Sequence, residues 1–352
     1  MNRHQEHIED LVFTDPKRAL KLMNKIIDGK VDLTLKVDGA PSFVVGREPK
    51  TGDLFVSTKS YFNMKPIYHK DTSNISDEHL AYKFDNILRE FRNVDLPHVL
   101  QGDFLFGPDC WGYEREHHVV HPNTLLYGWK KRPEGRLGVA FHTSYADGKP
   151  SPYLRNDFNI PDRVYVMPIN VDHGKYDMSN SCASVFSDYY DPIIDDVAKS
   201  IGEIKHLLPC MRTAINSLIR NQKPLELDNF IDGVLHQLEK AFSAYKTAAK
   251  RDEVRSSIRA FRFLSASSNF STWFRFYVAV GVAKRLVINK LNSQADVKTF
   301  VKTTDGFINP SQHEGYVVFD GGEAIKLVNR RHFSYHNFSP YILRGWEKPM
   351  ER

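Results

Sequence analysis

The stretch LTLKVDGAPSFVVG, residues 33–46, places a lysine at the end of a half-buried strand and directly before a turn. Apolar residues alternate with polar ones, a period of two that predicts one buried face, formed by Val31, Leu33, Leu35 and Val37. Lys36 is therefore expected on the opposite face, and Gly39 and Pro41 then turn the chain. A lysine in this position is either a solvated residue or a positioned nucleophile.

The composition is that of a soluble globular protein, with 41% apolar and 26% charged residues in a chain of 352. No segment approaches the run of about 18 apolar residues that predicts a membrane span, and the first residues lack the apolar core of a signal peptide. Cys110, Cys182 and Cys210 are odd in number and far apart, which favours reduced thiols. We expect a cytoplasmic protein without a membrane partner, in the host cytoplasm if a phage encodes it; its oligomeric state stays open.

Apolar periodicity divides the chain into a β-rich part, a helical block and a return to β structure. The individual predictions are helices at 1–30 and 75–93, strands at 98–107 and 136–145, and hairpins at 42–58 and 314–328. An α+β fold follows, in which a large, mainly helical subdomain is inserted into a discontinuous core. The predicted division is a core at 1–175 and 300–335, a helical basic subdomain at 184–295 and a C-terminal tail at 336–352.

The helical block is strongly basic. Eleven Lys and Arg residues lie between Lys240 and Lys290, against two acids, on a chain of net charge +5. Four arginines recur at spacings that place them on one helix face, namely Arg251, Arg255, Arg259 and Arg262. A solvated face normally mixes charge signs, so this face predicts binding to a polyanion such as nucleic acid. The interleaved aromatics are expected to pack in the core: Phe261, Phe263, Trp273 and Phe276.

Four short motifs follow one another along the chain: KVDG at 36–39, STKS at 57–60, LQGDFLFG at 100–107, and EGYVV at 314–318 with a lysine-bearing strand after it. This order resembles the covalent nucleotidyltransferase superfamily of DNA ligases, RNA ligases and mRNA capping enzymes. KVDG, STKS and EGYVV are most similar to phage RNA ligases, and to an uncharacterised group of phage proteins with KxDGxP. The resemblance covers roughly residues 30–145 and 305–330. It implies two mostly antiparallel sheets that enclose an ATP cleft.

The resemblance also implies a chemistry, in which a lysine amine attacks the α-phosphate of ATP and forms a lysyl-AMP. Only the neutral amine attacks, so its pKa is expected to be lowered by burial or by nearby cations. The implied catalytic residues are Lys36, Asp38 and Lys326. Glu314 is the implied ligand of Mg²⁺ or Mn²⁺. The implied ATP contacts are Lys36, Gly39, Lys59, Asp103 at the ribose, Phe141 stacked on the purine, Glu314 and Lys326.

Two positions depart from the superfamily pattern: Asp103 stands where Glu is usual, and Ala324 replaces the first lysine of a KxK pair. The same residues also have purely structural interpretations: Lys36 as an edge-strand lysine that discourages aggregation, and Glu314 with Lys326 as a cross-strand ion pair. The predicted activity is ATP-dependent joining of 5′-phosphate and 3′-hydroxyl ends, of RNA in preference to DNA. The alternatives are a non-catalytic nucleic-acid-binding protein on a decayed ligase core, and AMP transfer to a protein or small molecule.

Overall fold

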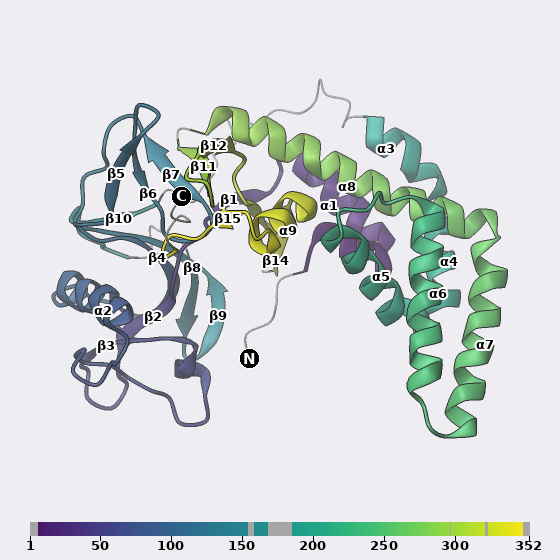
Figure 1. Ribbon diagram of the computed structural model, residues 1–352, viewed down its shortest axis with the longest axis horizontal. Coiled ribbons are helices and arrows are strands. Elements are labelled where there is room, and N and C mark those ends of the chain that lie inside the picture. The colour runs from purple at the N-terminus through teal and green to yellow at the C-terminus, as the bar shows by residue number, and fades with distance from the viewer. Residues whose placement is uncertain (1–5, 154–157, 168–184, 296, 321–322, 348–352) are drawn as a thin grey trace.

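The computed structural model describes residues 6–153, 158–167, 185–295, 297–320 and 323–347. Figure 1 shows a β-rich part at one end and a helical block at the other, so the protein is of the α+β class, as predicted. A long helix, α8 (Ser268–Gln294), extends from the far end of the helical block back toward the sheets. Among the described residues, every helix is too short or too polar to cross a lipid bilayer.

One six-stranded sheet has the order β10-β8-β4-β2-β3, with β9 paired to β8. Its strands are β2 (Ser42–Arg47), β3 (Leu54–Ser57), β4 (Val99–Phe106), β8 (Leu137–Ala146), β9 (Lys149–Pro152) and β10 (Val164–Val166). Helix α2 (Glu78–Phe91) covers one face, because its apolar side buries Phe84, Ile87 and Phe91 in the same core as Phe43 and Phe141. The hairpin predicted at 42–58 and the helix predicted at 75–93 are confirmed.

A second six-stranded sheet has the order β12-β11-β7-β6-β5, with β15 paired to β11. Its strands are β5 (Trp111–Glu114), β6 (His117–Val120), β7 (Leu126–Trp129), β11 (Lys298–Thr303), β12 (Ile308–Ser311) and β15 (Ile342–Leu343). In the sequence, β11 comes after the helical block and β7 comes before it, and the two strands pair with each other. The segment predicted as a tail at 336–352 is therefore partly built into the fold, since β15 pairs with β11 and follows helix α9 (Arg330–Phe338).

The two sheets expected from the sequence are joined by a third, three-stranded sheet of order β1-β13-β14. Its strands are β1 (Asp32–Lys36), β13 (Gly315–Asp320) and β14 (Glu323–Val328), and the β13–β14 pair confirms the predicted hairpin. The expectation of two sheets was wrong because β1 does not continue into β2; it pairs instead with β13, with Lys36 opposite Gly315. This pairing brings the first and last motifs together.

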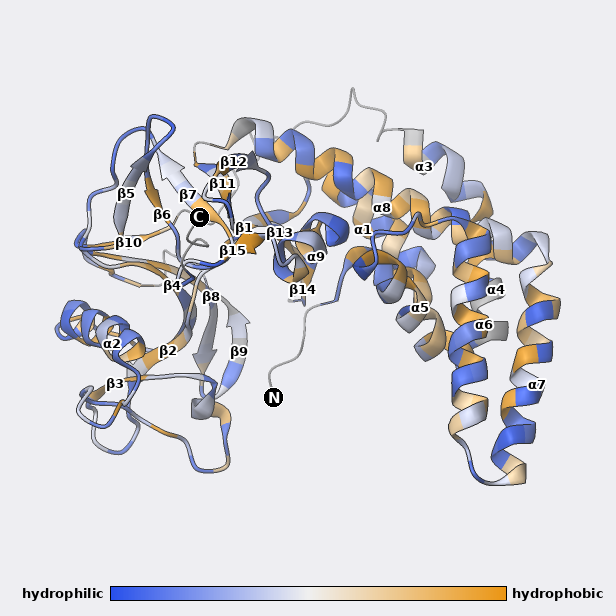
Figure 2. Ribbon diagram, viewed as in Figure 1, coloured by the Kyte–Doolittle hydropathy of each residue, from blue (hydrophilic) through white to orange (hydrophobic). Residues whose placement is uncertain are grey.

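The helical block contains α3 (Val185–Tyr190), α4 (Ile194–Ile204), α5 (Leu208–Arg220), α6 (Leu227–Ala244), α7 (Ala248–Ser265) and α8. The N-terminal η1 (Ile8–Phe13) and α1 (Pro16–Ile27), grouped with the β core by sequence, pack instead against these helices in one hydrophobic cluster. The amphipathic pattern of α1 explains this, since its apolar face needs a partner and helices α4 and α8 supply it. Hydrophilic residues run along much of α7 (Figure 2).

Candidate active site at the junction of the three sheets

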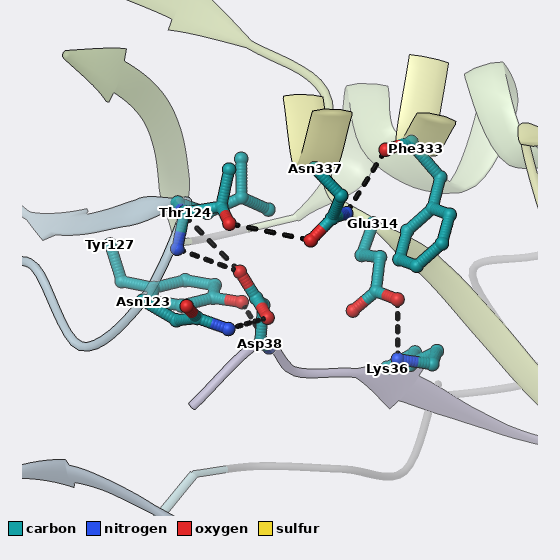
Figure 3. A network of polar contacts seen from close by, with 9 residues as sticks. Lys36, Asp38, Asn123, Thr124, Tyr127, Glu314, Phe333 and Asn337 are labelled. Atoms are coloured by element: carbon teal, nitrogen blue, oxygen red, sulfur yellow. Dashed lines mark hydrogen bonds and ion pairs between the residues drawn. The ribbon is translucent and has the colours of Figure 1, made fainter. Parts of the chain in front are cut away.

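Lys36 ends strand β1 and forms an ion pair with Glu314, the residue just before β13. The Lys36 Nζ to Glu314 Oε1 distance is 2.5 Å, and their side chains are 26% and 5% exposed. The second carboxylate oxygen of Glu314, Oε2, is buried and has no hydrogen-bond partner among the described residues. Figure 3 shows both side chains pointing toward each other from neighbouring elements. The KVDG and EGYVV motifs thus meet at one pair of atoms.

Asp38 is held by the loop that precedes β7. Its Oδ1 accepts a hydrogen bond from Asn123 Nδ2 at 2.7 Å, and its Oδ2 accepts from the backbone amides of Thr124 and Leu125 at 3.0 and 3.3 Å (Figure 3). The Asp38 amide donates to the Tyr127 hydroxyl at 2.6 Å. Both carboxylate oxygens are engaged, so Asp38 is positioned to anchor the turn after Lys36 and to keep a negative charge beside it.

Two glycines allow the strands to approach each other here. A Cβ at Gly39 would lie 2.7 Å from Asp103 Cβ and from Phe104 O, so a larger residue would push the turn away from β4. Gly315, opposite Lys36, has φ of +150°, and its Cβ would lie 2.2 Å from Leu327 O. The predicted contact of Gly39 with a nucleotide stays a prediction, while its packing against β4 is evident.

Asp103 lies on β4 beside the Lys36 pair. Burial raises the pKa of its carboxyl to about 7, although the positive charge of Lys36 and a hydrogen bond from Ser42 oppose the shift. The carboxylates of Asp38 and Glu314 add to the rise. Burial therefore brings the protonation of Asp103 close to neutral pH. A protonated carboxyl group can donate as well as accept a hydrogen bond.

Lys326 and Lys59 add positive charge around Lys36, and His142 lies close to all three lysines. Burial and the charge of Lys36 lower the pKa of Lys326, while Glu314 opposes the shift. His142, on β8, has a pKa of about 4, because burial and then the charges of Lys36, Lys59 and Lys326 disfavour its protonation. Solvent still reaches the His142 ring, although protein surrounds most of it. Lys59 is exposed at the start of η2 (Lys59–Phe62).

The electrostatics of the Lys36–Glu314 pair differ from the sequence expectation. Burial alone lowers the pKa of Lys36, but the paired carboxylate of Glu314, with Asp38 and Asp103, more than offsets this, so the pKa is raised. Burial also raises the pKa of Glu314, and the attraction of Lys36 only partly opposes it. The expected lowering of the Lys36 pKa is therefore wrong for the protein without a nucleotide, in which Lys36 is a charged ammonium.

The structure contradicts the stacking role predicted for Phe141. Its ring is 1% exposed and packs edge-on against Phe43 and Phe91, in the core beneath α2. Successive side chains of a strand point to opposite faces, so the next residue, His142, faces the lysines instead. Sequence reasoning missed His142, although the alternation in VAFHTSY could have revealed it. Phe141 has the same side of the strand as the apolar Val139, which leaves His142 on the opposite side.

The donor set suits a metal ion that arrives with a triphosphate better than one held by protein alone. Among the described residues, no group of three His, Cys, Asp or Glu side chains is arranged to hold a metal. Oε2 of Glu314 nevertheless has no hydrogen-bond partner among the described residues, so this carboxylate oxygen is available to a metal ion. Mg²⁺ is typically bound by one or two carboxylates together with substrate phosphates, so the fit is to a metal–nucleotide complex.

The four predicted arginines all lie exposed on α7, which confirms the helix and the single face. Arg251 Nε donates to Tyr245 O at 2.7 Å, and Arg255 pairs with Asp252 at 2.8 Å. The face lies at the opposite end of the molecule from the two six-stranded sheets (Figure 1). Lys284, counted in the basic block, is instead buried and paired with Glu9, and Phe263, expected in the core, is 86% exposed.

These observations define an α+β protein in which charged side chains from two sheets and their adjoining turns converge on one lysine, beside a loop of the third sheet. The chain belongs to DUF6267, a family of unknown function whose model matches residues 2–341. Comparison with curated proteins and with solved structures gave no match.

Proposed function

We propose that the protein is an ATP-dependent nucleotidyltransferase that forms a lysyl-AMP on Lys36. The observation that supports this best is the convergence of Lys36, Asp38, Asp103, Glu314 and Lys326 around one amine, from strands distant in the sequence. An ion pair with a purely structural role would need only two of these residues. Three carboxyl groups and two lysines in one partly buried site require an electrostatic reason, and a triphosphate that carries a divalent cation supplies one, because it presents both signs of charge.

The first step of the proposed reaction is attack by Lys36 Nζ on the α-phosphorus of ATP. A nitrogen–phosphorus bond forms, the bond from the α-phosphorus to the bridging oxygen breaks, and pyrophosphate leaves. Lys36 must first lose a proton and release Glu314. Glu314 Oε1 already accepts a hydrogen bond from Nζ, and its raised pKa makes it a suitable proton acceptor. Lys326 and Lys59 would neutralise charge on the leaving phosphates.

Other residues of the site have narrower proposed roles. Mg²⁺ or Mn²⁺ bound with the triphosphate would neutralise phosphate charge, and Glu314 Oε2 is the carboxylate oxygen available to it. Asp38 would keep the turn after Lys36 fixed, because the 123–125 loop holds both of its oxygens. Asp103 would contact the ribose, and His142 would take the place beside the nucleotide that Phe141 cannot reach.

The proposed second and third steps follow those of ligases. A 5′-phosphate oxygen attacks the lysyl-AMP and breaks the nitrogen–phosphorus bond, and a 3′-hydroxyl then displaces AMP. RNA is the preferred polynucleotide and DNA the second choice, on the resemblance to phage RNA ligases. The arginine face of α7 would hold the backbone away from the site, since guanidinium contacts to phosphates are independent of sequence.

Intact-mass measurement after incubation with ATP and Mg²⁺ tests the proposal. The protein should gain the mass of one AMP in an acid-labile bond, and Lys36→Ala should abolish the gain. Lys25→Ala is a matched control, because Lys25 pairs with Asp320 at 2.6 Å in the same region but lies outside the site. An adduct that persists in Lys36→Ala, or no adduct in the unaltered protein, would contradict the proposal.

A second candidate is a nucleic-acid-binding protein on a ligase core that has lost catalysis. The burial of Phe141 and the presence of Ala324 favour it, because both remove contacts that the superfamily makes with ATP. Oligonucleotide binding without any lysyl-AMP would select this candidate. AMP transfer to a protein or small molecule would instead give the adduct on Lys36 without sealing of polynucleotide ends.

A further inference from the structure

Four aromatic side chains are exposed along α9 and the segment after it. They are Tyr335, Phe338, Tyr341 and Trp346, with 47, 65, 66 and 52% of their surfaces exposed. Tyr335 and Phe338 are three residues apart and share one face of α9, whereas Ser334 and His336 on the other side are buried. We call these four residues the C-terminal aromatic surface. So many exposed rings in twelve residues indicate an interaction site.

Arginines lie beside these rings. The Arg220 guanidinium is 5.4 Å from the Phe338 ring centroid, and that of Arg344 is 5.8 Å from the Trp346 ring centroid. Arg344 also reaches the end of α9, since its Nη2 donates to Asn337 O at 3.4 Å. Glu347 is the only acid between residues 330 and 347, and its carboxylate accepts from the Arg344 backbone amide at 2.7 Å. The surface therefore combines aromatic faces with positive charge.

The surface adjoins the candidate active site. Thr124 Oγ1 donates to Asn337 Oδ1 at 3.5 Å, and the Gly345 amide donates to Asn123 O at 2.9 Å. Asn123 and Thr124 are the same residues that hold the carboxylate of Asp38. Figure 3 shows Asn337 linked through Thr124 to Asp38. One layer of residues thus separates the C-terminal aromatic surface from the turn after Lys36, whereas α7 lies far away (Figure 1).

We propose that the C-terminal aromatic surface binds the bases of a single-stranded nucleic acid, with Arg220 and Arg344 on its phosphates, and so presents an end of the strand to the site. This inference rests on the proposed function for the identity of the ligand. Proteins that hold single strands combine positive charge with aromatic rings on which bases stack. Helix α7 itself has one exposed ring, Phe263, among many charges, so its face suits the backbone, and the aromatic surface suits the terminal bases.

The experiment compares two fluorescently labelled, 5′-phosphorylated strands of about 12 nucleotides, one with bases and one abasic, without ATP. Affinities are measured for the unaltered protein, Phe338→Ala, Tyr341→Ala and the control Tyr113→Ala, whose ring on β5 is 64% exposed. Each of the first two variants should weaken binding of the strand with bases by about fivefold or more and leave the abasic strand nearly unchanged. Tyr113→Ala should change neither. Quenching of Trp346 fluorescence by the strand with bases provides a second readout.

Unchanged affinities in Phe338→Ala and Tyr341→Ala would overturn the inference and assign the surface to a protein contact. Equal losses for both strands would overturn it too, because phosphates alone would then explain the binding. Lys25→Ala, outside the site, should bind the strand as the unaltered protein does. Failure of adenylylation with intact, base-dependent binding therefore contradicts only the proposed function, and intact adenylylation without base-dependent binding contradicts only this inference.

Discussion

Removing the cation of the Lys36–Glu314 pair is the sharpest test of the electrostatics of the site. Lys36→Met keeps most of the side-chain volume but leaves a carboxylate that is 5% exposed, with one oxygen already lacking a partner among the described residues. Breaking a buried pair in this way costs about 3–5 kcal/mol. Lys36 is one quarter exposed, so we expect the lower end, about 3 kcal/mol, at pH 8.

The loss should depend on pH, because Glu314 can take up a proton instead of remaining charged. Burial already raises the Glu314 pKa in the presence of Lys36, and without the cation it should rise further. Between the unfolded and folded pKa values the folded protein then binds more protons than the unfolded chain, so stability falls as pH rises. The deficit of Lys36→Met should shrink by up to about 1.4 kcal/mol per pH unit on going from pH 8 toward pH 5.

The measurement is equilibrium urea unfolding at pH 8 and pH 5, with shifts in midpoint compared at constant slope. The double variant Lys36→Met/Glu314→Gln should recover stability to within about 1 kcal/mol of the unaltered protein, because position 314 no longer carries an unpaired buried carboxylate. Lys25→Met is the control, since its pair with Asp320 is about one third exposed and should contribute about 0.2–1 kcal/mol. A loss below about 1 kcal/mol in Lys36→Met at pH 8, or no recovery in the double variant, would refute the reasoning.

Three further sites give separate expectations. Phe141→Ala should lower the free energy of unfolding by about 3–5 kcal/mol without changing ATP affinity. His142→Ala should weaken ATP binding and leave the free energy of unfolding nearly unchanged. Urea unfolding and equilibrium dialysis measure the two quantities. Burial raises the pKa of Glu9, but the charges of Lys284 and Arg330 outweigh it and lower the pKa to about 2. The Glu9 carboxylate therefore stabilises the fold fully above its ordinary pKa, and this stabilisation is lost as pH falls toward 2. Lys284→Met should flatten this acid dependence in urea titrations. Replacing the α7 arginines with Gln should spare adenylylation and lower the salt slope of nucleic-acid binding by up to about 3–4 units; the residues are Arg251, Arg255, Arg259 and Arg262.

Local pattern was sufficient for most elements of the fold. The hairpins of β2 with β3 and of β13 with β14, and the helices α2 and α7, follow from periodicity and turn residues alone. What could not be predicted is which distant segments pair. Strand β1 pairs with β13, which lies far away in the sequence, and β15 pairs with β11. These pairings could not be predicted, because backbone hydrogen bonds between strands do not depend on side-chain identity and so leave no signal in the local sequence.

The motif order predicted which charged residues lie together, but it was wrong about the face of Phe141 and about the direction of the Lys36 pKa shift. Lys36, Asp38, Asp103, Glu314 and Lys326 come together as the motif order implied. Phe141 failed because a shift of one residue along a strand exchanges the two faces of a sheet. The β4–β8 ladder is also irregular near this point, between Gln101 and Gly102. Sequence order locates a strand well, but the face that a given residue presents depends on register.

The helical block forms the rear support of the site as well as a candidate nucleic-acid surface. In β14, Ile325 and Leu327 point into the same core as Trp273 of α8, so the intervening Lys326 must face the other way, toward Lys36. Tyr316 of β13 lies in that core too, and its hydroxyl donates to Asn292 Oδ1 of α8 at 2.9 Å. The hairpin that carries Lys326 is thus fixed from behind by helices inserted between the motifs. A chain from which 185–294 is deleted would expose this apolar face and lose the geometry of Lys326 and Glu314, even with every motif residue present.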